Sequence, residues 1–307
     1  MKVYIKKPNI QGAWIWILEG YRLAWQSLNY DVNYFNDIEE LRDEENHIIM
    51  IFDWDLHQKK DSYLKIFEKS YKTFLFVQPN NFPNPWGTHP NFISCLDENY
   101  INKLNSIKKI KKWSILLQNK EDNYFNLWDG HIEAIHFAYN NIAYESLKKY
   151  NKSLEFDLCY VGSWANNGFD EKKQIMMQYF GKLKQTNLKC GFFINKNLTI
   201  EQEASLLFSS KIGFNVHDNY ARTLKLDINE RVFKTLGLNG FMSSDMPYLI
   251  NKILPNCKTI SYNSIDDMIE KTIDHINIDL KDIKQNNIDL ILKGHTYINR
   301  VNQMETL

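Results

Sequence analysis

Hydrophobic and polar positions follow two different periods along most of this chain. The opening residues, MKVYIKK, alternate with the period of two that is typical of a strand. Residues 47–54, HIIMIFDW, form a continuous apolar run suited to a central strand buried on both faces. Between such runs, apolar residues recur at helical spacing, as in residues 13–30 and 199–210. This alternation predicts an α/β fold with an open, mostly parallel sheet.

The pattern weakens over residues 126–153 and restarts with a strand at residues 155–164. A chain of 307 residues also exceeds the usual size of one compact α/β unit. We therefore expect two successive Rossmann-like halves, joined within residues 126–153. Residues 37–45 and 257–263 are interpreted as a charged helix and a further strand.

Composition narrows the class of protein. Lys+Arg and Asp+Glu both number 37, and this balance argues against a nucleic-acid partner bound by phosphate neutralisation. The basic run at residues 103–113 is interpreted as a solvated helix face, which is also compatible with loose contact to an anionic membrane surface. No signal-peptide pattern or bilayer-length apolar run occurs, so we expect a cytoplasmic protein, with the inner membrane face as an alternative site.

The four cysteines are scattered, without the spacing of a zinc site or of a disulfide framework. We expect free thiols and no metal site. The dinucleotide fingerprint, the P-loop, the GxSxG elbow, the HExxH pair and the EF-hand loop are all missing from the sequence. An α/β pair of domains without these motifs favours sugar-nucleotide enzymes and binding proteins.

Ligands of parallel sheets bind beyond the carboxyl ends of the strands. In the second half this rule selects three strand-end segments and one helix start, at residues 162–163, 190–192, 215–217 and 229–231. Glycine after a strand lets a backbone approach a ligand closely, and a helix start offers unpaired N–H groups to an anion.

Arg231 lies in the first turn of a predicted helix, where a positive charge needs an explanation. A cation in the first turn of a helix is unfavourable for the helix dipole. Either an anion docks there, or Arg231 pairs with Glu230, Asp227 or another acid nearby. The spacing alone does not decide between these two interpretations.

Four segments occur in the order of a known pattern: FDLCYVGSW (156–164), GFF…SLLFSSKIGFNVH (191–217), NERVFKTLGLNGFMSSD (229–245) and HTYINRV (295–301). Together they resemble the carboxyl-terminal domain of group 1-type glycosyltransferases, in the branch of the CgeB-like spore maturation proteins. The segment EAIHFAYNNIAY (133–144) resembles the hinge of such enzymes. The resemblance covers about residues 130–305.

The resemblance implies a GT-B fold, with two Rossmann-like domains facing across a cleft. The implied parts are an acceptor domain, a nucleotide-sugar domain and a terminal helical segment that packs back toward the first domain, at residues 1–145, 146–285 and 286–307. It further implies a UDP- or GDP-linked sugar donor as substrate, with no metal ion and no other cofactor.

Carried onto this sequence, the pattern implies a set of donor-binding residues. Gly162, Ser163, Glu230 and Arg231 would meet the diphosphate, Gly191 and Phe192 the nucleobase, and Asn215 and His217 would line the cleft, with Asn229 at the helix start. Lys234 stands where the family has a glutamate that contacts the ribose. A lysine cannot accept those hydrogen bonds, so Glu230 would substitute, or Lys234 would meet a phosphate, or the donor is unusual.

The first half would supply the acceptor surface and, for an inverting transfer, a general base. Asp53 and His57, in FDWDLH, are the candidates, and Arg231 would act on the leaving group. Asp55 is instead interpreted as a helix cap. Gly12, in the loop after the first strand, would approach the sugar or the acceptor.

These residues favour a glycosyltransferase that moves a sugar from a nucleotide-sugar to a glycan or surface-polymer acceptor. Two alternatives stay open at this point. A sugar-nucleotide epimerase would use the same scaffold, and a non-catalytic sugar- or nucleotide-binding module would explain the departure at Lys234.

Overall fold

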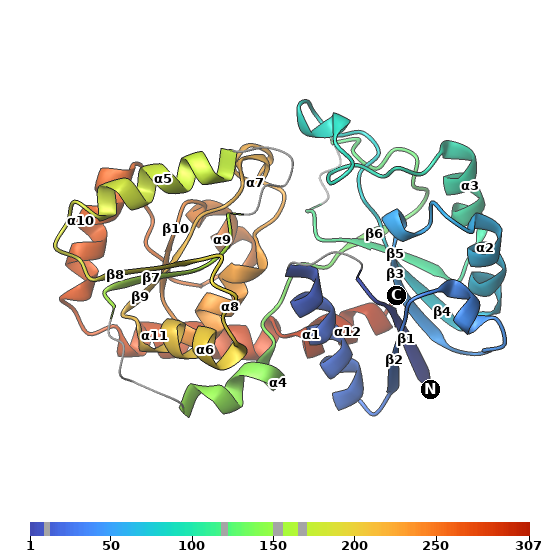
Figure 1. Cartoon of the computed structure of the whole chain (residues 1–307), viewed down its shortest axis with the longest axis horizontal. Helices are drawn as coiled ribbons and strands as arrows, with labels where there is room; N and C mark the ends of the chain where they lie inside the picture. Colours follow the sequence, from blue (N-terminus) through green and yellow to red (C-terminus); the bar gives the residue numbers. More distant parts are fainter. Residues whose placement is uncertain (9–12, 118–121, 150–155, 165–170) are drawn as a thin grey trace. The chain divides into compact units, whose positions relative to one another are not determined.

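The computed structural model describes residues 1–8, 13–117, 122–149, 156–164 and 171–307. Within them the chain divides into two compact units, Met1–His136 with Ile298–Leu307, and Phe137–Tyr297. Each unit is built on its own parallel sheet (Figure 1). The first unit thus ends before the expected boundary at residue 145. The expected terminal segment, 286–307, is divided between the units after Tyr297.

Among the residues described, the first unit holds a six-stranded parallel sheet in the order β2-β1-β3-β4-β5-β6. Every residue of β3 is buried, as its continuous apolar run predicts. The strands are β1 (Lys2–Lys6), β2 (Asp31–Phe35), β3 (Ile48–Phe52), β4 (Lys72–Phe76), β5 (Ile110–Ser114) and β6 (Ile132–Ala134).

Helices cover both faces of this sheet. The α2 and α3 helices lie on one face, and α1 and α12 lie on the other (Figure 1). The expected charged helix after β2 is only a short 3-10 helix, η1, whose start is fixed by a capping box at Asp37. The bounds are α1 (Ala13–Ser27), η1 (Ile38–Leu41), η2 (Asp53–Asp55), α2 (Lys60–Lys69), η3 (Trp86–Thr88), α3 (Glu98–Ser106) and α12 (Tyr297–Glu305).

The basic run at residues 103–113 is not one helix face. The α3 helix ends at Ser106, and β5 begins at Ile110. Ile110 and Trp113 are buried, while the two lysines between them are only partly exposed. The prediction of a solvated helix face was therefore wrong for the second half of the run, where two apolar anchors fix a strand inside the sheet.

Among the residues described, the second unit holds a four-stranded parallel sheet in the order β10-β9-β7-β8. The strands are β7 (Leu158–Gly162), β8 (Cys190–Ile194), β9 (Ile212–Asn215) and β10 (Met242–Ser244). The expected strand at residues 257–263 is reduced to one bridge, between Ser243 and Ile260. The β10 edge is only three residues long and offers little backbone for a further strand to pair with.

The helices of the second unit also lie on both faces of its sheet. The α5 and α10 helices cover one face, and α6, α8 and α11 cover the other (Figure 1). The bounds are α4 (Asn141–Tyr144), η4 (Glu145–Lys149), α5 (Glu171–Leu183), α6 (Ile200–Ser209), α7 (Asn219–Leu224), α8 (Glu230–Asn239), α9 (Pro247–Ile253), α10 (Ile265–Ile276) and α11 (Lys281–Gly294).

Gly240, directly after α8, has two roles. Gly240 takes a left-handed conformation, with φ 81°, which glycine adopts without a steric penalty. A Cβ atom at this position would also lie 2.5 Å from the backbone oxygen of Lys284 in α11. The sequence Asn239-Gly240 therefore both ends α8 and allows α11 to pack closely against that end.

Candidate functional site

The carboxyl ends of β7 and β9 lie beside each other because the two strands pair directly and in parallel. The helix α5, which follows β7, and the helix α8, which precedes β10, lie on opposite faces of the sheet (Figure 1). Open α/β sheets bind their ligands at such a switch point. The α8 helix begins here, and its first-turn residue Arg231 contacts both strands.

Three groups hold the guanidinium of Arg231. Its Nε donates a hydrogen bond to Val161 O at 2.8 Å, and its Nη1 donates to Asn215 Oδ1 at 3.1 Å. The guanidinium carbon lies 4.7 Å from the centre of the Tyr160 ring, a favourable cation–π distance. All three partners are electrically neutral, so the positive charge of Arg231 is oriented without being cancelled.

No carboxylate in the described part of the chain pairs with Arg231. Glu230 lies beside Lys234 instead, at 3.5 Å, and Asp227 accepts a hydrogen bond from the Tyr220 hydroxyl at 2.8 Å. Among the described residues, the alternative in which Arg231 is simply paired with Glu230, Asp227 or another acid therefore finds no support. A partly buried arginine with unused N–H donors is suited to bind an anion.

The start of α8 adds backbone donors to this surface. Asn229 is the N-cap residue, but its side chain makes no capping hydrogen bond. The N-cap side chains of α3, α6 and α10 do make such bonds. The first-turn N–H groups of α8 therefore lack the acceptor that usually satisfies them, and their dipole favours a negative charge.

Gly162 is required by Arg231. A Cβ atom on Gly162 would lie 2.2 Å from Arg231 Nη2, so any larger residue would displace the guanidinium. The next residue, Ser163, is partly exposed, and its backbone oxygen accepts a hydrogen bond from Tyr160 at 3.0 Å. The segment after β7 thus fixes both the ring beneath Arg231 and the space beside it.

Asn215 and His217 were expected to line the ligand cleft, and this expectation is corrected by their burial. Both side chains are 0% exposed. His217 Nδ1 lies 2.7 Å from Asp245 Oδ1, and the backbone N–H of His217 donates to Asp245 Oδ2 at 3.0 Å. These residues stand behind Arg231 and do not reach a ligand in this structure.

Asp245 is a member of this polar group that sequence reasoning did not select. Burial raises the pKa of its carboxyl, but the charge and hydrogen bonds of His217, with the charge of Arg222, outweigh burial and leave that pKa below its usual range. Its position directly after β10 would have selected it, had the strand-end rule been applied to that strand as well.

Lys234 is neutralised within the protein. Its Nζ lies 2.7 Å from Glu203 Oε1 and 3.5 Å from Glu230 Oε2. The Tyr144 hydroxyl donates to the other oxygen of Glu203 at 3.0 Å. Burial lowers the pKa of Lys234, but the two carboxylates more than compensate and raise it overall. Because these contacts occupy the Lys234 amine, the structure does not support its expected contact with a phosphate.

Gly191 and Phe192 do not join the site. They were expected at a strand end, but both lie inside β8, and Gly191 is its second residue. A Cβ atom on Gly191 would lie 2.8 Å from the Phe193 ring, and Phe192 stacks on Phe180 with ring centres 4.2 Å apart. Both positions serve packing within the strand.

The first unit presents its candidates after β3. Asp53 is 0% exposed, accepts a hydrogen bond from Gln78 N at 3.0 Å, and has its pKa raised to about 7 by burial. Burial also raises the pKa of Asp55, to about 6. His57 is exposed, and its Nδ1 lies 2.7 Å from Trp54 O. Asp53 therefore ties two strand ends together and cannot touch an acceptor here, whereas His57 can. Gly12 lies outside the described residues.

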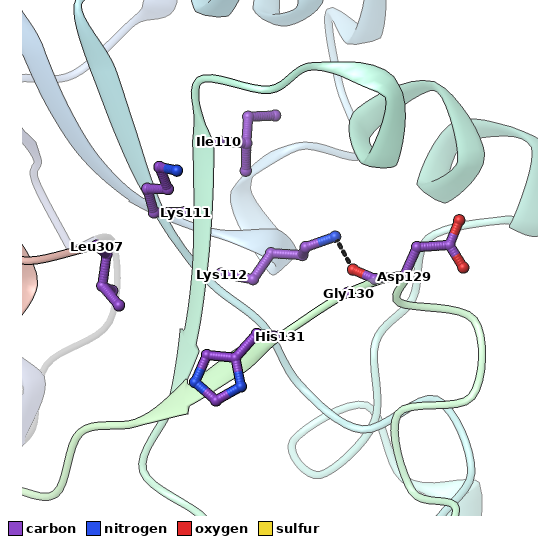
Figure 2. Close-up of a pocket in the computed structure, with 7 residues that line it drawn as sticks. All are labelled: Ile110, Lys111, Lys112, Asp129, Gly130, His131 and Leu307. Atoms are coloured by element: carbon purple, nitrogen blue, oxygen red, sulfur yellow. Dashed lines mark hydrogen bonds between the residues drawn. The ribbon is translucent and has the colours of Figure 1, made fainter.

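A separate cavity of about 270 Å³ lies in the first unit, beside the amino-terminal ends of β5 and β6. Figure 2 shows Lys112 among the lining residues, where its Nζ donates a hydrogen bond to the backbone oxygen of Asp129. The cavity adjoins the start of β5 and the residues before β6, so it lies away from the carboxyl ends of the strands. Its lining residues are Ile110, Lys111, Lys112, Asp129, Gly130, His131 and Leu307.

The described ranges offer neither a metal-binding cluster nor a membrane-spanning helix. No cluster of three or more histidine, cysteine or acidic side chains is arranged to hold a metal ion in those ranges. No helix in them combines the length and the apolar character needed to cross a bilayer.

Solved structures resemble this chain over nearly its whole length. The N-terminal domain of Candida albicans trehalose-6-phosphate phosphatase matches with TM-score 0.58 and 7% identity, covering 99% of this chain and 95% of that chain. The E. coli trehalose-6-phosphate protein bound with UDP-2-fluoro glucose gives 0.57 and 9%, covering 100% and 98%. An alpha-glucosyltransferase in complex with UDP-glucose and DNA containing an abasic site gives 0.57 and 9%, covering 99% and 98%.

At these identities the likeness concerns the fold alone. That fold, with two parallel α/β sheets, is the GT-B architecture of glycosyltransferases, as the family resemblance implied. Residues 149–306 match the family described as glycosyl transferase-like, which is more than half of the chain. The chain belongs to that family, and the matched region contains α8 and Arg231. A search of curated proteins found no match.

Proposed function

We propose that this protein is a metal-independent glycosyltransferase of the hexosyltransferase type. It transfers a sugar from a UDP- or GDP-linked donor to a glycan or surface-polymer acceptor. Within its family we place it in the CgeB-like branch, on the four ordered segments of the second half. The E. coli and alpha-glucosyltransferase structures bound to UDP-linked sugars support a donor of this class.

One observation carries the proposal. Arg231 is fixed at the switch point between β7 and β9, and its charge is not cancelled by any carboxylate of the described residues. It stands beside the first-turn N–H groups of α8, which the side chain of the N-cap residue Asn229 does not cap. An anion with several oxygens, such as a diphosphate, satisfies both kinds of donor at once.

The same arrangement serves the chemistry. When the bond between the sugar and the diphosphate breaks, negative charge develops on the leaving oxygen. Donors already aimed at that position stabilise the transition state without reorganising, and such stabilisation is commonly the largest catalytic contribution. We assign this role to Arg231, with the backbone of Gly162 and Ser163 and the first turn of α8, Asn229 and Glu230, lining the diphosphate site.

For an inverting transfer, we propose His57 as the general base. The Trp54 carbonyl can only accept a hydrogen bond, so His57 Nδ1 carries the proton and Nε2 is the acceptor nitrogen. His57 is exposed, whereas Asp53 is buried. A base must reach the acceptor hydroxyl, and of the two only His57 does so without rearrangement.

The first experiment measures binding of UDP and GDP to the full-length protein by thermal unfolding and calorimetry. Arg231→Ala should remain folded and lose about tenfold to a hundredfold in affinity, since hydrogen bonds to charged groups contribute about 1.5–3 kcal/mol. Arg42→Ala, at an exposed arginine of the first unit, is the matched control and should bind as the unaltered protein does.

Two results would overturn the proposal. One is that no nucleoside diphosphate or sugar nucleotide stabilises the unaltered protein, and the other is that Arg231→Ala binds them equally well. Product analysis separates the alternatives, because a transferase releases free nucleoside diphosphate with a transferred sugar. An epimerase keeps the donor intact, and a binding module turns nothing over.

A further inference from the structure

The side chain of Asn215 has only one possible orientation. Arg231 Nη1, at 3.1 Å, can only donate a hydrogen bond, so the amide oxygen of Asn215 must face it. The amide nitrogen then faces the other way, 3.2 Å from His217 Nδ1, 3.4 Å from His217 Nε2 and 3.4 Å from Ser244 Oγ. The amide therefore lies against the imidazole ring.

The imidazole ring is itself fixed. Asp245 accepts from His217 Nδ1 at 2.7 Å and from the His217 backbone N–H at 3.0 Å, and its side chain is 1% exposed. Arg222 Nε stands 3.5 Å from the other side of the same carboxylate. A continuous polar chain thus runs from Arg222 through Asp245, His217 and Asn215 to Arg231, and the side chains of its three middle members are buried.

The chemistry of Asn215 explains why an amide stands at this position. A carboxylate here would orient Arg231 equally well, but it would cancel the charge that attracts an anion. An amide oxygen accepts the hydrogen bond and leaves the charge intact. A long arginine side chain loses considerable rotamer entropy when ordered, and a partner that orders it beforehand removes this cost from ligand binding.

We propose that Asn215 is a positioning residue, held by the His217–Asp245 pair, that aims the Arg231 guanidinium at the diphosphate of a bound nucleotide. This inference rests on the proposed function of Arg231. Asn215 touches no ligand, because it is fully buried, and it acts only through Arg231.

Two variants with the same branching and the same number of heavy side-chain atoms as asparagine test the role. Asn215→Leu removes the acceptor, and we expect about a tenfold loss of UDP or GDP affinity by calorimetry. Asn215→Asp keeps the acceptor but adds a negative charge beside Arg231, and we expect a larger loss together with a fold at least as stable. The matched control is Ser243→Ala, at a buried hydroxyl on β10 that has no hydrogen-bond partner among the residues the structure describes, and its affinity should change less than twofold.

A double variant separates positioning from general damage. If Asn215 acts only through Arg231, then Asn215→Leu in an Arg231→Met background should cost no further affinity. Losses that multiply, or full affinity in both Asn215 variants while Arg231→Met binds weakly, would overturn the positioning role alone. Unchanged binding in Arg231→Met would overturn the proposed function, and with it this inference. Should Asn215→Leu not fold, Asn215→Ala, which also removes the acceptor without adding a charge, decides by the same comparison.

Discussion

Arg231 and Lys234 lie one turn apart on α8 and have opposite electrostatic surroundings. Lys234 forms ion pairs with the carboxylates of Glu203 and Glu230, so its charge is neutralised within the protein. Arg231 contacts a backbone oxygen, an amide oxygen and a ring face, none of which carries a charge. The difference in partners, more than the type of residue, decides which cation is available to an external anion.

Gly162 provides a test at this scale. Gly162→Ala would place a methyl group 2.2 Å from Arg231 Nη2, so the guanidinium must move away from Val161 O and Asn215. We expect about a tenfold loss in nucleotide affinity by calorimetry. The control is Gly181→Ala inside α5, where an added Cβ meets nothing within 4 Å. That change should leave binding unaltered and stabilise the fold by about 0.5–1 kcal/mol. Full affinity in Gly162→Ala would show that the guanidinium position is irrelevant to binding.

The sequence located Arg231 and Gly162 through general rules about strand ends and helix starts. It did not reveal that Gly162 makes room for Arg231, since the two lie far apart in the chain. It also could not show that Asn215 and His217 are buried, because that depends on Asp245, which follows two further helices and a strand. Strand ends can be predicted locally, but the direction of each side chain depends on non-local packing.

At the scale of elements, the sequence predicted a helix or strand correctly where its hydrophobic periodicity and its end signals agreed. The apolar run of β3 and the start of α8 at Asn229 were visible in the sequence. The prediction failed where a short element depends on its neighbours. Two anchors, Ile110 and Trp113, make β5 a strand despite the lysines between them, and the expected strand at 257–263 has almost nothing to pair with.

Asp53 links two such elements and gives a stability test. It follows β3 and accepts the backbone N–H of Gln78, just beyond β4. An unfolded aspartate releases its proton near pH 4, whereas burial raises the pKa of native Asp53 to about 7. The native state thus binds more protons between these values, and stability falls as the pH rises through that window.

We expect Asp53→Asn to remove this contribution. In urea unfolding, the loss of stability between pH 5 and pH 8 should be smaller in the variant by roughly 3 kcal/mol. Asp43→Asn, at an exposed aspartate of the same unit, should keep the pH dependence of the unaltered protein. An identical pH dependence in Asp53→Asn would mean that Asp53 titrates alike in both states.

At the scale of the whole molecule, the candidate residues for donor binding and for the general base belong to different units. Arg231 and its supporting polar chain belong to Phe137–Tyr297, and His57 belongs to the unit of Met1–His136. The family match covers the former almost completely and leaves most of the latter outside. Donor binding and acceptor activation should therefore respond separately to mutation.

His57→Gln tests this separation. Loss of a general base lowers turnover by about 10²- to 10⁴-fold, while the donor, bound by the other unit, should keep its affinity within about twofold. Arg231→Ala should instead lower the donor affinity markedly. His131→Gln is the control, since His131 is an exposed histidine of the first unit that pairs with Glu133 at the far edge of the sheet. Unchanged turnover in His57→Gln would remove it as the base, and an equal loss of donor affinity would show that the two roles are not divided between the units.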